Sequence, residues 1–377
     1  MAASRSHVSR TRLRLASRLG WRALGGLSLL GLVAVGFFGT AVWLVHETWV
    51  SMLDGNVIDA LFAVATFMVT IAMGAVSAGW LCAPTASPDG VCLPREAAEP
   101  LYRLVERMSR RFGNARIDAI WIVGDMNAAI LQRPRWGLFG PMETHLMIGL
   151  PLAHSVSRRQ FSAILAHEFA HLVLQRRGLQ AWWGHLRAWW FRALDRCVED
   201  ATWLGEVLER WSAKDLRDAM RLSRLEEFEA DALAGQVVGA RLVGEALVEV
   251  ALKERFLSED YWRKVMEQSH FEPRPVIRPF REMGLGVMAG FRRPIPGSVD
   301  IRYVYGQRAS ASDFHPTLNE RLRALRVMPE VPRAGANTLA NACLGPLLPT
   351  LAWIFDRAWW EDSRRDWRQR YQRARCA

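Results

Sequence analysis

Cysteine is scarce and scattered in this chain of 377 residues. The cysteines lie far apart, their number is odd, and no two of them form a Cys-x-x-Cys pair; they are Cys82, Cys92, Cys197, Cys343 and Cys376. Such a set argues against a disulfide framework and against a zinc site built from thiolates. It fits a protein whose thiols face a reducing compartment.

The chain also lacks the common signatures of nucleic-acid recognition, although it is basic. Its net charge is +11, and positive charge can bind nucleic acid by releasing counterions from phosphates. No helix-turn-helix, zinc-finger or RNA-binding motif accompanies that charge. The arginines gather instead at the two ends, in residues 5–22 and 357–375. We therefore expect arginine-rich ends that flank a membrane anchor, and no nucleic-acid partner.

Two stretches near the N-terminus contain almost no charge. Residues 23–45 have no charged side chain, and residues 57–83 have only Asp59. Each stretch exceeds the roughly 20 residues that a helix needs to cross a bilayer, and the first is longer than the apolar core of a cleaved signal peptide. They predict a transmembrane hairpin with spans at about 23–45 and 57–83. Two buried core helices are the alternative.

The distribution of arginine predicts the orientation of this hairpin. Arginines precede the first span, whereas the connection at residues 46–56 has no Lys or Arg. Positive charge stays on the cytoplasmic side of a membrane. We therefore expect an integral protein of a bacterial inner membrane, with its N-terminus and everything after residue 83 in the cytoplasm.

Beyond the hairpin, local patterns predict a mainly α fold with a small β-sheet. Residues 84–100 are rich in Pro and small residues and are typical of a linker. Ser157 opens a Ser-x-x-Gln capping box, which predicts a helix from Arg158 to Arg177. Residues 271–312 are rich in Pro and Gly and are predicted to be irregular. The other predicted elements are a helix from 101 to 112, strands at 116–123 and 144–152 separated by loop, and mostly helix up to about 270.

Two apolar segments permit two interpretations each. The tryptophans at 182, 183, 189 and 190 recur at a spacing of seven and share a helix face, which suits either a helix on the membrane surface or ordinary core. Residues 338–355 are about long enough to span a membrane, but Pro346 and Pro349 interrupt them. We expect this second segment to dock on the domain or to dip into the membrane interface.

The sequence His167-Glu168-x-x-His171 has the spacing of a metal site. Residues four apart share one helix face, so His167 and His171 can present two imidazole nitrogens to one ion. Glu168 is rotated by about 100° from His167 and can face a water on the metal, whose proton it can accept as a general base. This is the logic of HExxH. By itself the motif also arises by chance, so a third ligand is needed.

A second helical segment offers that ligand. Glu227 and Asp231 are four residues apart, so two carboxylates share a face. A zinc peptidase of this type needs one Glu to complete the coordination, and an acidic group that accepts the distal N–H of a ligand histidine. A solvated acidic face is the alternative. Phe228 and the small residues around it favour a close-packed site.

Taken together, these segments resemble the HtpX-like membrane zinc metallopeptidases, a family that includes the CAAX prenyl endopeptidases. The resemblance covers about residues 100–327 and implies a gluzincin-like zinc peptidase domain. The chain departs from the family where two further spans are common, because residues 180–211 are too rich in Arg to cross a bilayer. The matched segments, in order, are the hairpin, Asn127-Ala128, His167-Glu168-x-x-His171, Ser223-Arg224, Glu227-Phe228-Glu229-Ala230-Asp231, and His315-Pro316 with Glu320-Arg321.

The resemblance implies a role for each matched residue in the metal site. The implied cofactor is one Zn²⁺ per chain. Glu168 is implied as the general base and Asp231 as the partner of a ligand histidine. The implied zinc ligands are His167, His171 and Glu227.

The resemblance also implies how substrate is recognised. A strand near residues 146–150 is expected to receive the substrate as an additional β-strand. His315 and Arg321 are implied to polarise the scissile carbonyl or stabilise its oxyanion, although a His-Pro sequence can equally begin a helix for structural reasons.

The predicted function is a membrane-anchored zinc endopeptidase that acts on exposed or misfolded segments of membrane proteins, in quality control. Its partners are expected to be protein substrates and the lipid bilayer. The alternatives are a catalytically inactive membrane scaffold or chaperone of the same fold, and a CAAX-type prenyl-protein endopeptidase. The predicted organisation is a basic cytoplasmic tail at 1–22, the hairpin at 23–83, the peptidase domain at 84–330, and an apolar and Arg/Trp-rich C-terminal segment at 331–377.

Overall fold

The structure is a computed structural model, and it describes residues 2–82, 85, 87–136, 139–175, 179–200, 202–292, 315–328 and 337–376. Most described residues are helical, and the described strands form one four-stranded sheet. This confirms the predicted mainly α fold with a small sheet. The chain divides into two compact units: residues 1–86, 133–142 and 175–223, and residues 87–132, 143–174 and 224–377.

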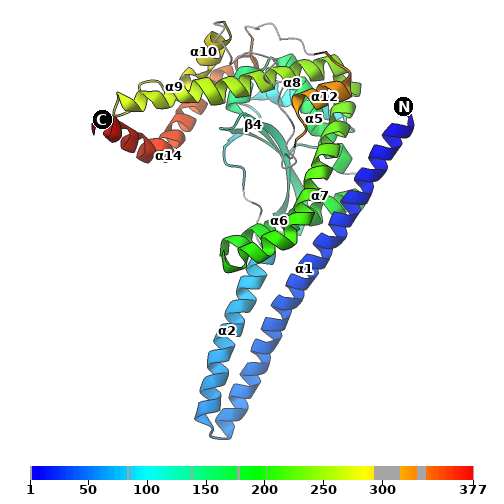
Figure 1. The fold of residues 1–377 in the computed structure, drawn as a ribbon, viewed down its shortest axis with the longest axis vertical. Helices are drawn as coiled ribbons and strands as arrows, with labels where there is room; N and C mark the ends of the chain where they lie inside the picture. Colours follow the sequence, from blue (N-terminus) through cyan, green and yellow to red (C-terminus); the bar gives the residue numbers. More distant parts are fainter. Residues whose placement is uncertain are drawn as a thin grey trace. The chain divides into compact units, whose positions relative to one another are not determined.

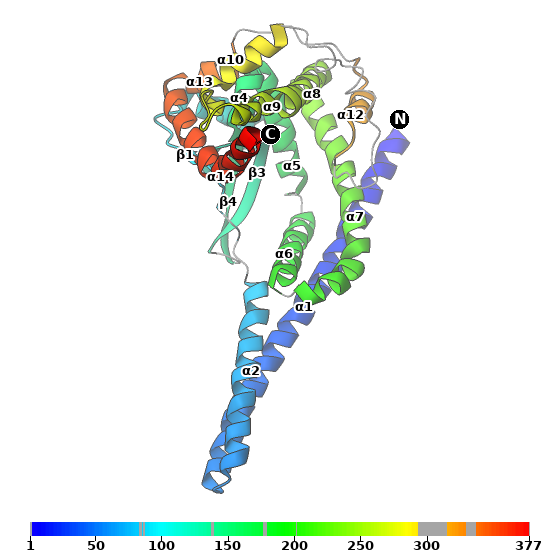
Figure 2. The same cartoon turned by 60° about the vertical axis from the view of Figure 1, so that its left-hand side comes forward.

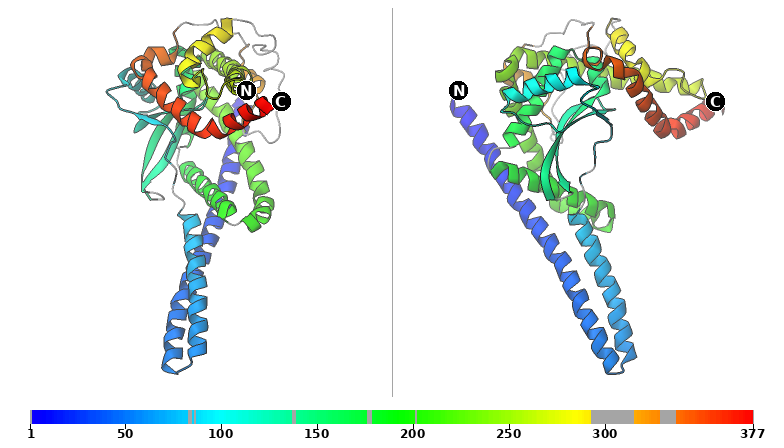
Figure 3. Two further views of the ribbon diagram at one scale, coloured as in Figure 1. Left: turned by 90° about the vertical axis from the view of Figure 1, so that its left-hand side faces the viewer. Right: turned by 180° about the vertical axis from the view of Figure 1, so that it is seen from behind.

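The first unit contains a long helical hairpin (Figures 1 and 3). Helix α1 (Ala2–Leu53) and helix α2 (Val57–Leu81) run antiparallel, joined by a turn in which Gly55 has a φ of 72°. The arginine-rich N-terminal residues are therefore the first part of α1. Phe62 and Val42 are among the apolar side chains that point outward, with exposed fractions of 74% and 72%. By length and composition both helices can cross a membrane, which supports a membrane protein.

The tryptophan-rich helix α6 (Leu179–Asp200) packs on this hairpin within the first unit. Trp190 is buried with Ala23 and Leu27 of α1, and the Trp189 indole donates a hydrogen bond to the carbonyl of Leu81 at 2.8 Å. Gly26 makes the contact possible, because a Cβ there would lie 2.5 Å from the Trp190 ring. One side of the stripe is therefore core. Trp182, in contrast, is 66% exposed.

The second unit contains the sheet except for residues 133–142, where β3 ends and β4 begins. Strands β1 (Val91–Leu93), β2 (Ala119–Val123), β4 (Phe139–Gly149) and β3 (Ala128–Trp136) lie in that order. Strand β1 is antiparallel to β2, and β2 is parallel to β4, with Ile120 opposite Leu146 and Ile122 opposite Ile148. These four side chains are fully buried in one core cluster with Leu101 and Leu104 of helix α3 (Glu99–Arg111). The alternation of the two strands thus places these four side chains on one face of the sheet, where the core covers them.

The sheet differs from the prediction in four respects. Strand β1 lies within residues 84–100, which were predicted to be a linker. Strand β3 lies where a loop was predicted. The predicted strand 144–152 ends three residues too late, because residues Leu150–Ser155 form helix α4. Pro151 has no N–H for a ladder but fits the first turn of a helix. Finally, β4 lies between β2 and β3, so both of its edges are paired and the expectation that residues 146–150 receive the substrate is wrong.

Helix α5 (Arg158–Gln175) begins where the capping box predicted. The Ser157 hydroxyl accepts the N–H of Gln160 at 3.2 Å, and the Gln160 side chain accepts the N–H of Ser157 at 2.8 Å. The predicted end at Arg177 lies outside the described residues. Helix α7 (Thr202–Ala234) follows α6. A π-turn at Gly235–Gly239 separates it from α8 (Ala240–Arg255).

The remaining helices pack on the second unit. They are η2 (Phe256–Tyr261), α9 (Trp262–Glu267), η3 (Gln268–His270), α10 (Pro279–Arg292), α12 (Leu318–Leu325), α13 (Leu339–Leu344), η4 (Gly345–Leu347) and α14 (Leu348–Cys376). The prediction that residues 271–312 are irregular is wrong for α10, and its part from residue 293 onward lies outside the described residues. The stretch 339–376 also has the length and composition of a membrane span. However, Leu344, Leu351 and Phe355 are buried in the main core, as expected of a docked helix.

Candidate metal centre

One stripe of α5 carries the histidines. The other sides of the helix pack in the core, where Phe161, Leu165 and Phe169 are fully buried. The side chains of His167 and His171 keep exposed fractions of 13% and 22%. Their rings are nearly perpendicular, at 87°, and the two Nε2 atoms are 3.1 Å apart. The helical period therefore brings two imidazole nitrogens to one point, as the spacing predicted.

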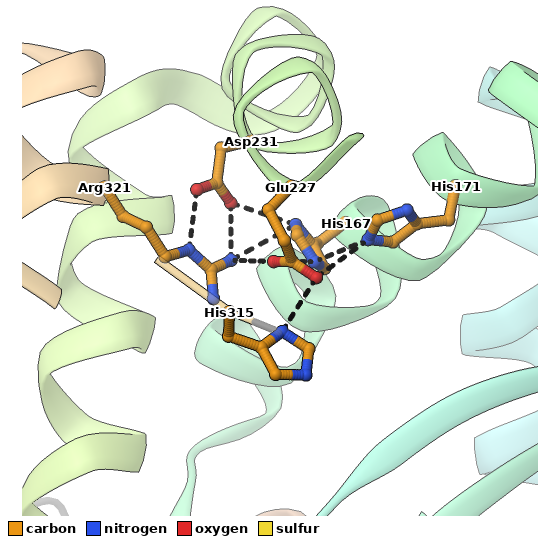
Figure 4. A network of polar contacts seen from close by, with 6 residues as sticks. All are labelled: His167, His171, Glu227, Asp231, His315 and Arg321. Carbon is orange, nitrogen blue, oxygen red and sulfur yellow. Dashed lines mark hydrogen bonds and ion pairs between the residues drawn. The ribbon is translucent and has the colours of Figure 1, made fainter. Parts of the chain in front are cut away.

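Helix α7 brings a carboxylate to the same point. The Glu227 oxygens lie 3.4 Å from Nε2 of His167 and 3.5 Å from Nε2 of His171 (Figure 4). One donor atom from each of these three residues lies within 4.8 Å of the others. The Glu227 side chain is only 7% exposed. Three donors from two helices thus converge in a partly buried space.

Asp231 holds the far side of His167. Its Oδ1 lies 2.9 Å from Nδ1 of His167, and its side chain is 1% exposed. A carboxylate accepts hydrogen bonds, so Nδ1 carries a proton, and Nε2 is the nitrogen left to bind a cation once its own proton is displaced. The second carboxylate of α7 therefore selects the tautomer that can bind a cation.

Asp231 is itself held by helix α12. The Arg321 guanidinium donates two hydrogen bonds to Asp231, from Nε and Nη2, each 2.7 Å long. A second ion pair joins the same two helices, with the arginine now on α7 and the carboxylate on α12. Arg224 donates to both oxygens of Glu320 at 3.0 and 2.9 Å. Bidentate pairs of this kind fix orientation as well as distance. Together they dock α12 on α7.

His315, which precedes α12, lies at the open side of the centre. Its Nδ1 is 3.1 Å from Oε1 of Glu227, and its side chain is 71% exposed. Arg321 lies deeper, with 15% of its side chain exposed. The structure thus brings both predicted residues to the centre, but the Arg321 guanidinium faces Asp231 and Glu227.

Glu168 faces a pocket of about 290 Å³ beside the same centre. The pocket is lined on one side by Asn127 and Ala128, at the start of β3, and on another by Val243 and Leu247 of α8. A backbone hydrogen bond links Glu168 to the N–H of Ile130 in β3. The candidate general base is therefore held against the edge strand of the sheet.

The environment perturbs the ionisation of these groups. Burial raises the pKa of Glu168, which favours a proton acceptor over a permanently charged carboxylate. Burial also opposes protonation of His167, but hydrogen bonds to Asp231 and Glu227 raise its pKa to about 9. Burial by itself would raise the pKa of Glu227, but its hydrogen bonds with His167, His171 and His315 outweigh burial and lower it.

The donor set fits a divalent cation with nitrogen and oxygen ligands. Nε2 of His167 faces the centre, 3.4 Å from Oε2 of Glu227, and this oxygen is buried without a hydrogen bond. A cation among His167, His171 and Glu227 would satisfy these atoms, and two imidazoles with one carboxylate are a common zinc ligand set. Zn²⁺ thus has a place among these residues.

Two features of the centre were not predicted from the sequence. One is the contact between Glu168 and the N–H of Ile130, which depends on the position of an unpredicted strand. The other is the pairing of Arg321 with Asp231. A signal for the second existed, because Arg224 and Glu320 also lie in the matched segments and form the reciprocal pair.

Comparison with known proteins bears on this arrangement. The model of peptidase family M48 matches residues 141–328, which include α5, α7 and α12. No curated protein and no solved structure matches the chain. The family match covers the HExxH helix, the acidic residues of α7 and the arginine of α12 that holds Asp231. The chain belongs to peptidase family M48.

Proposed function

We propose that this protein is a zinc-dependent endopeptidase with a gluzincin-like catalytic domain, anchored in a membrane by the α1–α2 hairpin. One observation carries the proposal: donor atoms of His167, His171 and Glu227 converge within 4.8 Å of one another, in a pocket that Glu168 also lines. Ligands and a candidate base in one pocket are the requirement for metal-assisted peptide hydrolysis. Membership of a peptidase family supports the reaction class.

The residues would divide the chemistry between them. A Zn²⁺ ion held by His167, His171 and Glu227 would supply Lewis-acid polarisation of the scissile carbonyl and lower the pKa of water. Glu168 accepts the proton of the attacking water and passes it to the departing amine. The raised pKa of Glu168 suits both steps, because the group must gain and lose one proton in each cycle.

Asp231 and Arg321 act as positioning residues in this proposal. Asp231 keeps the proton on Nδ1 of His167, and Arg321 keeps Asp231 in place with two hydrogen bonds. The Arg321 guanidinium is therefore already committed to a carboxylate. His315, which is exposed and lines the pocket, is the better candidate for a group that polarises the substrate.

The substrate backbone would pair with the free edge of β3. Strand β3 is the last strand of the sheet, and its first residues line the pocket. An edge strand offers unpaired N–H and C=O groups to an extended peptide. Recognition of main chain places few demands on sequence, which suits exposed or misfolded segments of membrane proteins as substrates.

The membrane anchor and its charges support a location and an orientation. The arginines before the first span and the turn without Lys or Arg favour an N-terminus and a catalytic domain in the cytoplasm of a bacterium. Hydrolysis at the membrane surface would then serve quality control of membrane proteins.

The test is the variant Glu168→Gln, purified as the full chain in detergent. We expect about one zinc per chain by elemental analysis, as in the wild type, and loss of cleavage of an unfolded protein substrate. Glu96→Gln, at an exposed position outside the pocket, is the matched control and keeps activity. Retained cleavage in Glu168→Gln contradicts the mechanism. Wild-type protein that binds zinc but cleaves neither unfolded protein nor prenylated peptide indicates an inactive scaffold.

A further inference from the structure

A second cavity lies in the same unit as the metal centre, on the other side of α4. Its volume is about 540 Å³, within the range of roughly 300–1,000 Å³ that small-molecule sites occupy. Helix α10 forms one wall, through Phe280, Gly284 and Leu285, and helix α14 forms the other. Figure 2 shows α4, α10, α13 and α14 close together. None of the residues that line it belongs to the pocket of the metal centre.

The buried polar group of this cavity is His154. It is 8% exposed, it lines the cavity, and no described residue forms a hydrogen bond with its ring. Burial lowers its pKa to about 4, so the ring is neutral at pH 7 and offers one donor and one acceptor. Buried polar groups are ordinarily hydrogen-bonded. The cavity therefore offers a neutral imidazole, which can donate and accept a hydrogen bond, to a ligand or water.

The rim of the cavity is cationic. Arg278 and Arg281 are exposed and line the opening, and neither forms an ion pair with a described residue. Asp356 also lines the cavity and attracts both arginines electrostatically, while its Oδ1 accepts the N–H of Phe280 at 2.8 Å. The rim thus carries two positive groups against one carboxylate that caps the start of α10. An anion fits this rim.

Exposed apolar side chains stand beside the arginines of the rim. Leu285 and Trp353 border the opening with exposed fractions of 63% and 56%, and Val276, two residues before Arg278, is 71% exposed. Tryptophan beside arginine is typical of the headgroup level of a bilayer. A basic pocket in a protein held at a membrane is a common site for an anionic lipid.

We propose that the cavity between α10 and α14 binds an anionic phospholipid, with its phosphate at Arg278 and Arg281 and an acyl chain between Phe280, Leu285 and Leu348. The polar linkage between headgroup and chain can reach His154. The site takes a lipid rather than free phosphate, because apolar side chains form most of its lining. It does not depend on the peptidase function.

The test uses the full chain in vesicles of phosphatidylcholine that contain a small fraction of phosphatidylglycerol with a photoactivatable group on one acyl chain. After illumination, peptide mapping is expected to find the adduct on α10 and α14. Phosphatidylcholine with the same photoactivatable chain is expected to label these helices at least about tenfold less. An excess of inorganic phosphate is expected not to compete.

Variants keep the proposal falsifiable. The double variant Arg278→Glu with Arg281→Glu is expected to lower labelling at least about tenfold, since both charge-assisted contacts are lost. The control, Arg274→Glu with Arg368→Glu, changes two exposed arginines and the net charge by the same amount, and keeps full labelling. Met288→Trp, which fills the cavity, is expected to abolish labelling.

Three outcomes overturn the proposal. They are equal labelling by the anionic and zwitterionic lipids, equal loss in the rim and control variants, and displacement of the lipid by inorganic phosphate. If Met288→Trp does not fold, the test relies on the rim variants. Their positions are exposed, so these substitutions leave the core unchanged.

Discussion

Arg321 and Asp231 determine the geometry of the metal centre through a neighbouring residue. Neither needs to touch a cation, yet the two hydrogen bonds between them hold the carboxylate that orients His167. A lysine at position 321 would keep the charge but lose the planar pair of donors. Charge alone is therefore not sufficient at this position.

We predict that Arg321→Lys lowers zinc affinity about 10- to 100-fold, as substitutions of groups behind a metal ligand commonly do. Competition with a chromophoric chelator measures this affinity in the purified full chain. Arg323→Lys, on the exposed side of the same helix, is the control and keeps the wild-type affinity. Equal affinity in the two variants would show that Arg321 acts only as a charge.

His154 predicts a dependence of stability on pH. Its pKa is about 4 in the folded chain and about 6.5 in an unfolded one. Between these values the unfolded state binds more protons, so the free energy of unfolding falls as pH falls from 6.5 to 4, by up to about 3 kcal/mol from this group. The contribution is fully present above pH 6.5.

The variant His154→Gln isolates this effect, because glutamine does not titrate. We expect the difference in stability between pH 7 and pH 5, measured as the denaturant midpoint in detergent, to be smaller in His154→Gln than in the wild type. An unchanged difference would mean that His154 titrates normally in the folded chain.

At the scale of elements, the end of β4 decides how closely the sheet approaches the active site. Gly149 donates its N–H to the carbonyl of Asn127 at 2.7 Å, and Asn127 lines the metal-centre pocket. A Cβ at Gly149 would lie 1.7 Å from the carbonyl oxygen of Asp125. The backbones can therefore meet only because residue 149 has no side chain.

We predict that Gly149→Ala destabilises the protein by at least about 1–3 kcal/mol, because backbone must move to admit the methyl group. Gly124→Ala is the matched control, since the nearest atoms to its Cβ would be 3.7 Å away, an ordinary contact. Thermal unfolding of both variants in detergent measures the difference. Similar midpoints would contradict the close approach.

At the scale of the whole molecule, the hairpin and its charges predict which parts face which side of the membrane. The native thiols Cys92 and Cys376 are exposed in the folded chain, and both follow the second span. In a variant with Asp54→Cys, the added thiol lies in the exposed turn between α1 and α2. These three positions report on opposite sides of the bilayer.

We predict that a membrane-impermeant maleimide added outside intact cells labels the thiol introduced by Asp54→Cys but leaves Cys92 and Cys376 unlabelled. After the cells are broken, the same reagent labels all three positions. Labelling of Cys92 or Cys376 in intact cells would place the C-terminal domain outside and contradict the proposed cytoplasmic catalytic domain.

Local patterns determined most of the elements that carry the metal centre. The capping box predicted the start of α5, the four-residue spacings put His167 with His171 and Glu227 with Asp231, and uncharged runs predicted the two long helices. These features depend on helical period, on caps and on hydrophobicity, which act within a few residues. The sequence therefore determined which donor atoms share a helix face.

Only the tertiary structure decided how these pieces meet. The sheet edge that lines the metal-centre pocket belongs to β3, because β4 is paired on both sides, and no local pattern records strand order. Arg321 turns to Asp231 because α12 docks on α7, 90 residues away along the chain. Trp190 is core because Gly26 of α1 leaves room for its ring. Such contacts depend on shape complementarity between distant segments, and only the folded chain brings those segments together.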